Sequence, residues 1–166
     1  MNKSPVFNII GIIRGTTVDG PGFRTSIYMA GCRHRCAGCH NPDSWNESEG
    51  TQMSLSQIME VVEEEDFDVT LSGGDPLFYP DKLKILIDAL KENRRNVWVY
   101  TGYTWEEILS DPLLFDAVNK ADVLVDGPFV EDLKDPDLPF RGSSNQRIID
   151  IPSSIKNGEI CLILRN

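Results

Sequence analysis

The stretch Gly31-Cys32-Arg33-His34-Arg35-Cys36-Ala37-Gly38-Cys39-His40-Asn41 decides how the rest of the chain is interpreted. It holds three of the four cysteines, with the spacing Cys-x3-Cys-x2-Cys. A single loop can bring three thiolates at that spacing around one centre. Three ligands without an evident fourth predict a metal site with an open position, and the surrounding sequence must say what fills that position.

Composition sets the broad class. The chain has 166 residues, 40% of them hydrophobic and 25% charged, which predicts one soluble globular domain over 1–166. The net charge is -10, from 26 acidic and 16 basic residues, which argues against nucleic acid as a partner. No apolar run reaches the roughly 18 residues of a membrane span, and no signal sequence is evident, so no membrane partner is expected.

These features together predict a cytoplasmic protein, in which thiols stay reduced. Clustered cysteines are then interpreted as metal ligands or reactive thiols rather than disulfides. The fourth cysteine, Cys161, lies in the apolar run 160–164 and is predicted to be part of the core.

Hydrophobic periodicity predicts strands that alternate with helices. Capping boxes are expected at Ser54 with Gln57 and at Thr104 with Glu107. Helices are predicted over 54–66, 80–93, 104–109 and 112–120, and strands over 7–13, 25–30, 68–71, 97–100, 123–125, 147–151 and 159–164.

This alternation predicts an α/β fold with a parallel sheet. Loops rich in Gly, Asp or Pro follow the strands that end at Leu71, Tyr100 and Val125. Ligands bind at the carboxyl ends of strands in such folds, so these loops and the cysteine loop are expected to converge on one rim.

Three kinds of site compete for the cysteine loop. A structural zinc site would use the three cysteines with His34 or His40, although such sites usually combine two separated ligand pairs. A redox or nucleophilic site would use Cys36 and Cys39 as a Cys-x-x-Cys pair and would leave Cys32 unexplained. An iron–sulfur cluster with three cysteine ligands would keep one iron free to bind a small molecule.

The motif Cys32-x3-Cys36-x2-Cys39 resembles the signature of radical S-adenosylmethionine (SAM) enzymes. The segments 19–24 (DGPGFR) and 40–45 (HNPDSW) resemble the activating enzymes of glycyl-radical enzymes. The segment 72–76 (SGGDP) is similar to the Gly-Gly-Glu-Pro motif of the superfamily, with Asp75 in place of Glu. Within the superfamily, the segments 101–104, 126–129 and 140–147 resemble the activating proteins of anaerobic (class III) ribonucleotide reductases. The likeness extends from residue 19 to residue 149.

This resemblance implies a [4Fe-4S] cluster held by Cys32, Cys36 and Cys39, with SAM on the open iron. It implies that the reduced cluster cleaves SAM, and that the resulting radical takes a hydrogen from a glycine of the partner, the large subunit of the reductase. A one-electron donor such as flavodoxin is implied as a second partner. A complete eight-stranded barrel needs about 250 residues, so a partial, open (β/α)6-like radical SAM barrel is expected.

The resemblance also assigns roles to residues around the cluster. Gly38, Cys39 and His40 are expected to line SAM through backbone groups, and Gly73 and Gly74 to let the backbone approach its methionine moiety. Asp75 is expected to accept hydrogen bonds from the SAM ammonium, although its short side chain counts against a direct contact. His34 and His40 are interpreted as tuning the cluster rather than ligating it. No catalytic side chain is expected beyond the cluster.

The sequence leaves two interpretations for each of three further residues in these motifs. Arg141 and Arg147 are candidates for binding the SAM carboxylate or the partner's loop, with surface salt bridges as the alternative. Asp19 belongs either to a partner-docking rim or to a simple turn.

Other functions compete with this interpretation. An activase for a different glycyl-radical enzyme, of the pyruvate formate-lyase type, is the nearest alternative. A non-enzymatic iron–sulfur electron carrier would normally ligate every iron with cysteine, and a zinc-binding interaction module would hold zinc instead of iron.

Overall fold

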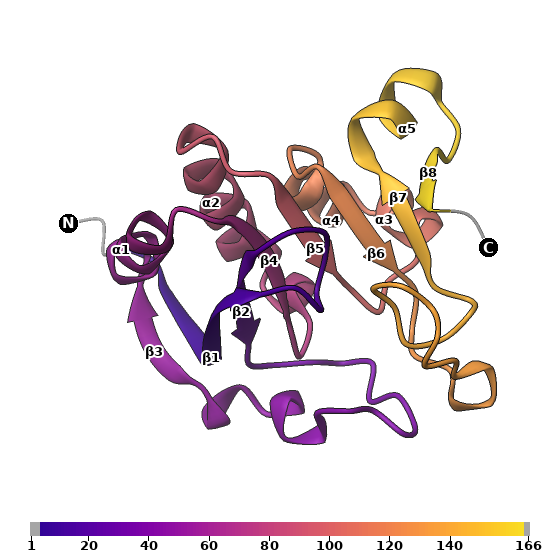
Figure 1. The fold of residues 1–166 in the computed structure, drawn as a ribbon, viewed down its shortest axis with the longest axis horizontal. Helices are drawn as coiled ribbons and strands as arrows, with labels where there is room; N and C mark the ends of the chain where they lie inside the picture. Colours follow the sequence, from indigo (N-terminus) through magenta and orange to yellow (C-terminus); the bar gives the residue numbers. More distant parts are fainter. Residues whose placement is uncertain (1–3, 165–166) are drawn as a thin grey trace.

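The computed structural model describes residues 4–164 and has an open eight-stranded sheet at its centre. The strand order is β3-β1-β2-β4-β5-β6-β7-β8, and the sheet does not close on itself (Figure 1). The strands are β1 (Val6–Thr16), β2 (Arg24–Met29), β3 (Thr51–Ser54), β4 (Asp68–Gly73), β5 (Val97–Tyr100), β6 (Val123–Asp126), β7 (Arg147–Asp150) and β8 (Leu162–Leu164). The predicted α/β class is confirmed.

Only the middle of the sheet is parallel. Strands β2, β4, β5 and β6 run in parallel, whereas β3 and β1 on one side and β7 and β8 on the other pair antiparallel. A parallel pair needs a long crossover, usually a helix. The short turn over 17–23 and the loop over 127–146 contain no α-helix, so the chain returns antiparallel after each.

The helices are α1 (Leu55–Glu65), α2 (Pro80–Glu92), α3 (Trp105–Ser110), α4 (Pro112–Val118) and α5 (Ile151–Asn157), with 3-10 segments η1 (Pro42–Trp45), η2 (Glu47–Glu49), η3 (Pro76–Phe78) and η4 (Glu131–Leu133). Four of the five α-helices, α1 to α4, match the predicted ranges closely. Both predicted capping boxes are present.

Sequence reasoning missed two short elements, β3 and α5. Helix α5 takes up the end of the predicted strand 147–151, because Asp150 caps its first turn by accepting from Ser153 N at 2.8 Å. Strand β3 lies immediately before the predicted helix over 54–66, where no strand was predicted, and its pairing with β1 gives it its conformation.

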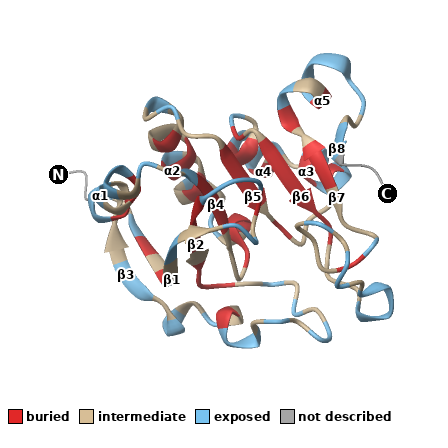
Figure 2. Cartoon of the chain, viewed as in Figure 1, coloured by how far each residue is buried: buried red, intermediate tan, exposed pale blue. Residues whose placement is uncertain are grey.

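Alternation along the strands separates two cores, and Figure 2 shows the central strands as the most buried part of the chain. One face carries the row Ile27, Leu71, Val99, Leu124 and Ile149, aligned by the strand register, and the helices cover it. The opposite face has a smaller apolar cluster formed by Trp98, Val123, Val125 and Ile148, with Tyr100 and Phe140 packed against it. Loops rather than helices cover this second face, and the site is built from these loops.

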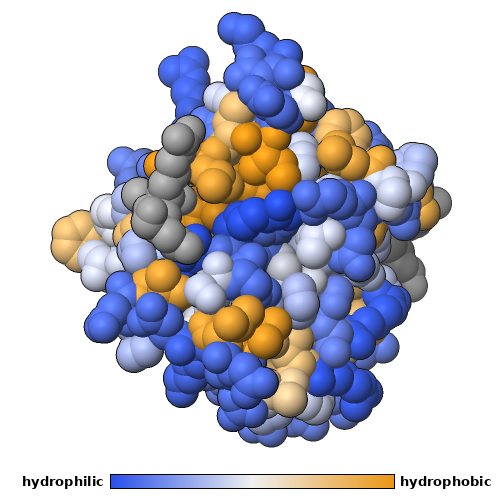
Figure 3. Space-filling model, turned by 90° about the vertical axis from the view of Figure 1, so that its right-hand side faces the viewer, coloured by the Kyte–Doolittle hydropathy of each residue, from blue (hydrophilic) through white to orange (hydrophobic). Residues whose placement is uncertain are grey.

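At the end of the sheet that carries α5 and β8, the prediction that Cys161 is part of the core is wrong. Cys161 is only half-buried and belongs to neither core; its Sγ accepts from Asn157 Nδ2 at 3.3 Å. Strand β8 is the edge of the sheet, and Ile163 in this strand is exposed, as is Ile155 in α5. On this side apolar patches alternate with hydrophilic surface (Figure 3).

None of the helices in the described part of the chain combines the length and apolar character that a bilayer span requires.

Candidate iron–sulfur and cofactor site

The loops at the carboxyl ends of the parallel strands enclose a cavity of about 450 Å³. This volume is in the range of pockets that bind small molecules. The cavity is lined by all three clustered cysteines and by residues at or just after the ends of β4, β5 and β6, namely Cys32, Cys36, Cys39, Ser72, Gly73, Gly74, Thr101, Gly102 and Gly127. The predicted convergence on one rim is thus confirmed.

The cysteine loop follows β2 and is held by its own backbone at both ends. Gly31 N donates to Ser44 O at 2.7 Å, and Cys32 N donates to Trp45 O at 3.1 Å. Within the loop, Cys39 N donates to Cys36 O at 3.1 Å. These bonds fix both ends of a short segment, so the three thiols are presented to the cavity from one wall.

The thiols are half-buried, and burial raises the pKa of the Cys32 thiol. No three His, Cys, Asp or Glu side chains among residues 4–164 converge closely enough to hold one metal ion. A single zinc ion would require its ligands about 2.3 Å from one point. A four-iron cluster takes one thiolate on each of several irons, so three separate thiols facing one cavity fit a cluster better than an ion.

Gly73 and Gly74 are required by backbone packing. A Cβ on Gly73, at φ +106°, would lie 2.3 Å from Met29 N, and one on Gly74 would lie 2.4 Å from Gly31 O. Gly74 N also donates to Met29 O at 2.7 Å. The two glycines therefore let the end of β4 lie directly against the start of the cysteine loop, while both still face the cavity.

Asp75 lies behind this wall and is buried, with 2% of its side chain exposed. Its carboxylate accepts from Leu77 N, Gly102 N and the Thr101 hydroxyl. His34, from the middle of the cysteine loop, places Nε2 at 2.8 Å from Oδ2 of Asp75. The adjacent Asp75 carboxylate raises the pKa of the His34 imidazole.

The far wall comes from the loop between β6 and β7. The ring of His40 lies against Phe129, with centroids 5.1 Å apart, and a Cβ on Gly38 would meet the side chain of Glu131. Phe140, Arg141 and other residues of this loop also line the cavity. Arg141 lines the cavity, and its Nη1 donates to Gln146 O at 2.9 Å.

The floor of the cavity is formed by the turn between β1 and β2. Asp19 lines the cavity and accepts a hydrogen bond from the Tyr28 hydroxyl. Its carbonyl accepts from Thr70 Oγ1, which in turn accepts from Nε of the buried Arg24 at 2.8 Å. Burial raises the pKa of Tyr28 and lowers that of Arg24. Asp19 is therefore fixed in place rather than part of a loose turn, and sequence reasoning did not identify Tyr28.

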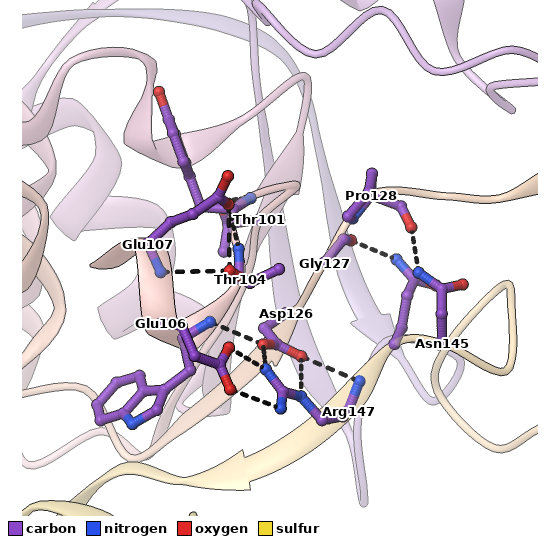
Figure 4. Close-up of polar contacts among 12 residues, drawn as sticks. Thr101, Thr104, Glu106, Glu107, Asp126, Gly127, Pro128, Asn145 and Arg147 are labelled. Atoms are coloured by element: carbon purple, nitrogen blue, oxygen red, sulfur yellow. Dashed lines mark hydrogen bonds and ion pairs between the residues drawn. The ribbon is translucent and has the colours of Figure 1, made fainter. Parts of the chain in front are cut away.

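Arg147 has a different role from the cofactor contact that the sequence allowed (Figure 4). Its guanidinium reaches the buried carboxylate of Asp126 at 2.5 Å and Glu106 at 2.7 Å. Asp126 also accepts from Trp105 N at 2.8 Å. These contacts account for Arg147 as a structural ion pair that joins β6, β7 and α3, and it does not line the cavity.

Comparison with known proteins adds independent information. Residues 18–149 match the family described as a 4Fe-4S single cluster domain. The chain is 37% identical over 139 residues to the anaerobic ribonucleoside-triphosphate reductase-activating protein of Escherichia coli K12, covering 78% of this chain and 89% of that protein. The proteins of the same name from Pasteurella multocida Pm70 and Enterobacteria phage T4 are 37% and 32% identical, each over 79% of this chain and over 89% and 86% of their own lengths.

Proposed function

The chain belongs to the family of anaerobic ribonucleoside-triphosphate reductase-activating proteins and contains a 4Fe-4S single cluster domain, and from this we propose how it acts. We propose that it generates a glycyl radical on the large subunit of anaerobic ribonucleotide reductase by radical SAM chemistry. The observation that carries this proposal is the arrangement of three thiols and three glycine-bearing strand ends around one cavity.

Cys32, Cys36 and Cys39 are the proposed ligands of a [4Fe-4S] cluster, with one iron left for SAM. When bound, the reduced cluster supplies the electron that cleaves SAM and so starts formation of the glycyl radical. The chain itself supplies position and shelter from water. The cysteine loop forms one wall of the cavity, and the loop over 127–146 forms the opposite wall.

The proposed SAM site comprises Gly38, Cys39, His40, Gly73, Gly74 and Asp75. Gly38, Cys39 and His40 offer backbone groups from the cysteine loop, and Gly73 and Gly74 offer backbone groups from the end of β4. Cys39, His40, Gly73 and Gly74 line the cavity, and Gly38 lies between residues that line it. Asp75 does not line the cavity. Asp75 belongs to the site as the neighbour that fixes these loops, which is argued below.

The proposed fold is a single radical SAM domain over 1–166, in the form of a partial (β/α)6-like barrel. An open sheet suits a macromolecular substrate, because a loop of the reductase must reach the cavity. The electron donor is proposed to be a one-electron carrier such as flavodoxin. The names of the relatives favour the reductase over another glycyl-radical enzyme as the partner.

The proposal is tested with anaerobically reconstituted protein, the reductase large subunit, SAM and a reductant. We expect about four irons per chain, SAM cleavage only after reduction, and a glycyl radical signal by electron paramagnetic resonance (EPR). Cys36→Ala should abolish all three. Cys161→Ala is the matched control, because it removes a thiol outside the cavity, and it should leave all three unchanged.

Each possible failure points to a different error. Full SAM cleavage by Cys36→Ala would contradict the ligand assignment. SAM cleavage without a glycyl radical on the reductase would transfer the proposal to a different glycyl-radical enzyme. Zinc in place of iron in anaerobically purified protein would reject the cluster altogether.

A further inference from the structure

The carboxylate of Asp75 is surrounded by polar groups of the protein. Oδ1 accepts from Leu77 N at 2.8 Å, and Oδ2 accepts from Gly102 N at 3.0 Å. The Thr101 hydroxyl lies 3.0 and 2.9 Å from the two oxygens, and His34 Nε2 lies 2.8 Å from Oδ2. An ionised carboxylate has about four acceptor sites. Three donors therefore hydrogen-bond to Asp75, and His34 Nε2 lies at ion-pair distance from Oδ2, so groups of the protein surround both oxygens.

The direction of the side chain agrees with this count. Asp75 is 2% exposed and does not line the cavity, whereas Gly74 before it and Thr101 and Gly102 beside it do. Its carboxylate thus faces the back of the cavity wall. A ligand in the cavity would meet the backbone of Gly73 and Gly74 before it could meet the Asp75 oxygens.

The donors come from the two loops that Asp75 would have to hold together. Thr101 and Gly102 follow β5, and His34 lies between Cys32 and Cys36. The backbone reinforces the link, because Asp75 N donates to Gly31 O at 2.7 Å. Asp75 therefore joins the end of β4 to the end of β5 and, at two points, to the cysteine loop.

His34 is also fixed from its other sides. Its ring meets the ring of Tyr103 edge-on, with centroids 4.6 Å apart, and Gly102 lies so close that a Cβ there would be 2.5 Å from His34 Cδ2. Nε2 lies at ion-pair distance, 2.8 Å, from Asp75 Oδ2, but the contact lacks hydrogen-bond geometry, and Nε2 has no hydrogen-bond partner among the described residues. The imidazole is held at one orientation in the middle of the cysteine loop.

We propose that Asp75 and His34 form a clamp that sets the position of the cysteine loop against the two glycine-bearing strand ends, and that neither side chain contacts SAM. Both are positioning residues, and the inference rests on the function proposed above. An aspartate suits the clamp because a glutamate, one methylene longer, would have to fit into a side-chain site that is already closed.

The test compares Asp75→Asn, His34→Ala and the double variant in the reconstituted protein. An asparagine keeps the shape, but its NH₂ group must face one of the donors that now point at the carboxylate. We expect each single variant to shift the EPR spectrum and midpoint potential of the reduced cluster before SAM is added. Cleavage of SAM should fall by about 10–100-fold in each. The double variant should be no worse than either single variant, because both remove one interaction.

Two further variants separate positioning from general damage. His34→Gln keeps an N–H donor and should restore the cluster spectrum toward that of the wild type. Asp126→Asn alters a carboxylate that is equally buried at another strand end but has no contact with the cysteine loop, so it should lower thermal stability and leave the spectrum unchanged. If Asp75→Asn does not fold, His34→Ala and His34→Gln carry the same test, since the His34 side chain is 19% exposed.

The outcomes that overturn the clamp differ from those that overturn the function. Weaker SAM binding by Asp75→Asn with an unchanged SAM-free spectrum would show direct contact with SAM. Multiplying losses in the double variant would show that the two residues act separately. A wild-type protein that assembles no cluster would reject the proposed function itself, before any clamp variant is compared.

Discussion

Asp75 and Asp126 are two buried carboxylates at strand ends, and they are neutralised in different ways. Asp126 ends β6 and is paired with Arg147, whose charge is permanent. Asp75 follows β4 and is surrounded by backbone N–H groups, a hydroxyl and the imidazole of His34. The first arrangement ties together β6, β7 and α3, and the second ties together the loops around the cavity.

The difference indicates which parts of the chain serve the scaffold and which serve the site. Every partner of Asp126 belongs to an element that would be needed for the fold alone. One partner of Asp75 comes from the cysteine loop, which contributes no residue to the main core cluster or to the smaller one. Substitutions around Asp126 should therefore change the free energy of unfolding, and substitutions around Asp75 should change the cluster.

The largest effect on stability is expected for Arg147→Met, which removes the counter-charge of a carboxylate that is 1% exposed. Breaking a buried pair in this way costs about 3–5 kcal/mol of unfolding free energy. Urea unfolding of the protein should show this loss, while the EPR spectrum of the folded fraction stays that of the wild type. Arg14→Met, which removes exposed ion pairs with Glu64 and Glu65, is the control and should cost far less, because solvent screens exposed pairs. Equal losses in the two variants would contradict the distinction.

A pair of glycines gives an intermediate effect and separates the two regions more finely. Gly102→Ala would place a Cβ 2.5 Å from His34 Cδ2, so the imidazole must move away from Asp75. Gly127→Ala meets nothing closer than 3.7 Å, but its φ of +91° disfavours any side chain. We expect a loss of about 1–3 kcal/mol in each, from the broken hydrogen bonds at Gly102 and from backbone strain at Gly127.

The two alanine variants should differ in the cluster. Gly102→Ala should reproduce the altered EPR spectrum of Asp75→Asn, and Gly127→Ala should not, because Gly127 lies against Asn145 rather than against the cysteine loop. Thermal unfolding and EPR of the same two preparations measure both quantities. A changed spectrum in Gly127→Ala, or a normal one in Gly102→Ala, would break the proposed division.

The sequence predicted the elements well where local rules decide them. The capping boxes at Ser54 and Thr104 and the apolar stripe of α2 were sufficient to place those helices. Strand β3 and helix α5 were missed because pairing with β1 and the cap from Asp150 decide them, and a local pattern carries neither. The antiparallel direction of the outer strands likewise depends on how the connecting segments bring the chain back to the sheet, which no local pattern shows.

The candidate site was predictable in composition but not in geometry. The residues around the cavity could be named from their motifs, since each follows a strand end. The direction of a side chain could not: Asp75 faces away from the cavity, and Arg147 is occupied by Asp126. The His34–Asp75 contact joins residues 34 and 75 through the tertiary fold, so no spacing in the sequence would have shown it.

The smallest expected effect lies at Glu106, on the exposed side of the Asp126 region. The hydrogen bond from Arg147 lowers the pKa of Glu106 below its ordinary value of 4.5. A carboxyl group whose pKa is lower in the folded state stabilises the fold above its unfolded pKa, and this contribution disappears as the pH falls through the folded pKa. Because the Glu106 side chain is 60% exposed, solvent screening limits the contribution to less than about 1 kcal/mol.

Glu106→Gln should therefore lower the unfolding free energy slightly at neutral pH. The gap to the wild type should narrow as the pH falls below 4.5 and close once Glu106 is protonated in the folded as well as the unfolded state. Glu60→Gln, at an exposed position of α1, is the matched control. Added salt should narrow the neutral-pH gap for Glu106→Gln, since it screens exposed charges. A gap that persists in acid would show that Glu106 acts through packing on Arg147, in which case even the outer partner would belong to the rigid pair at Asp126.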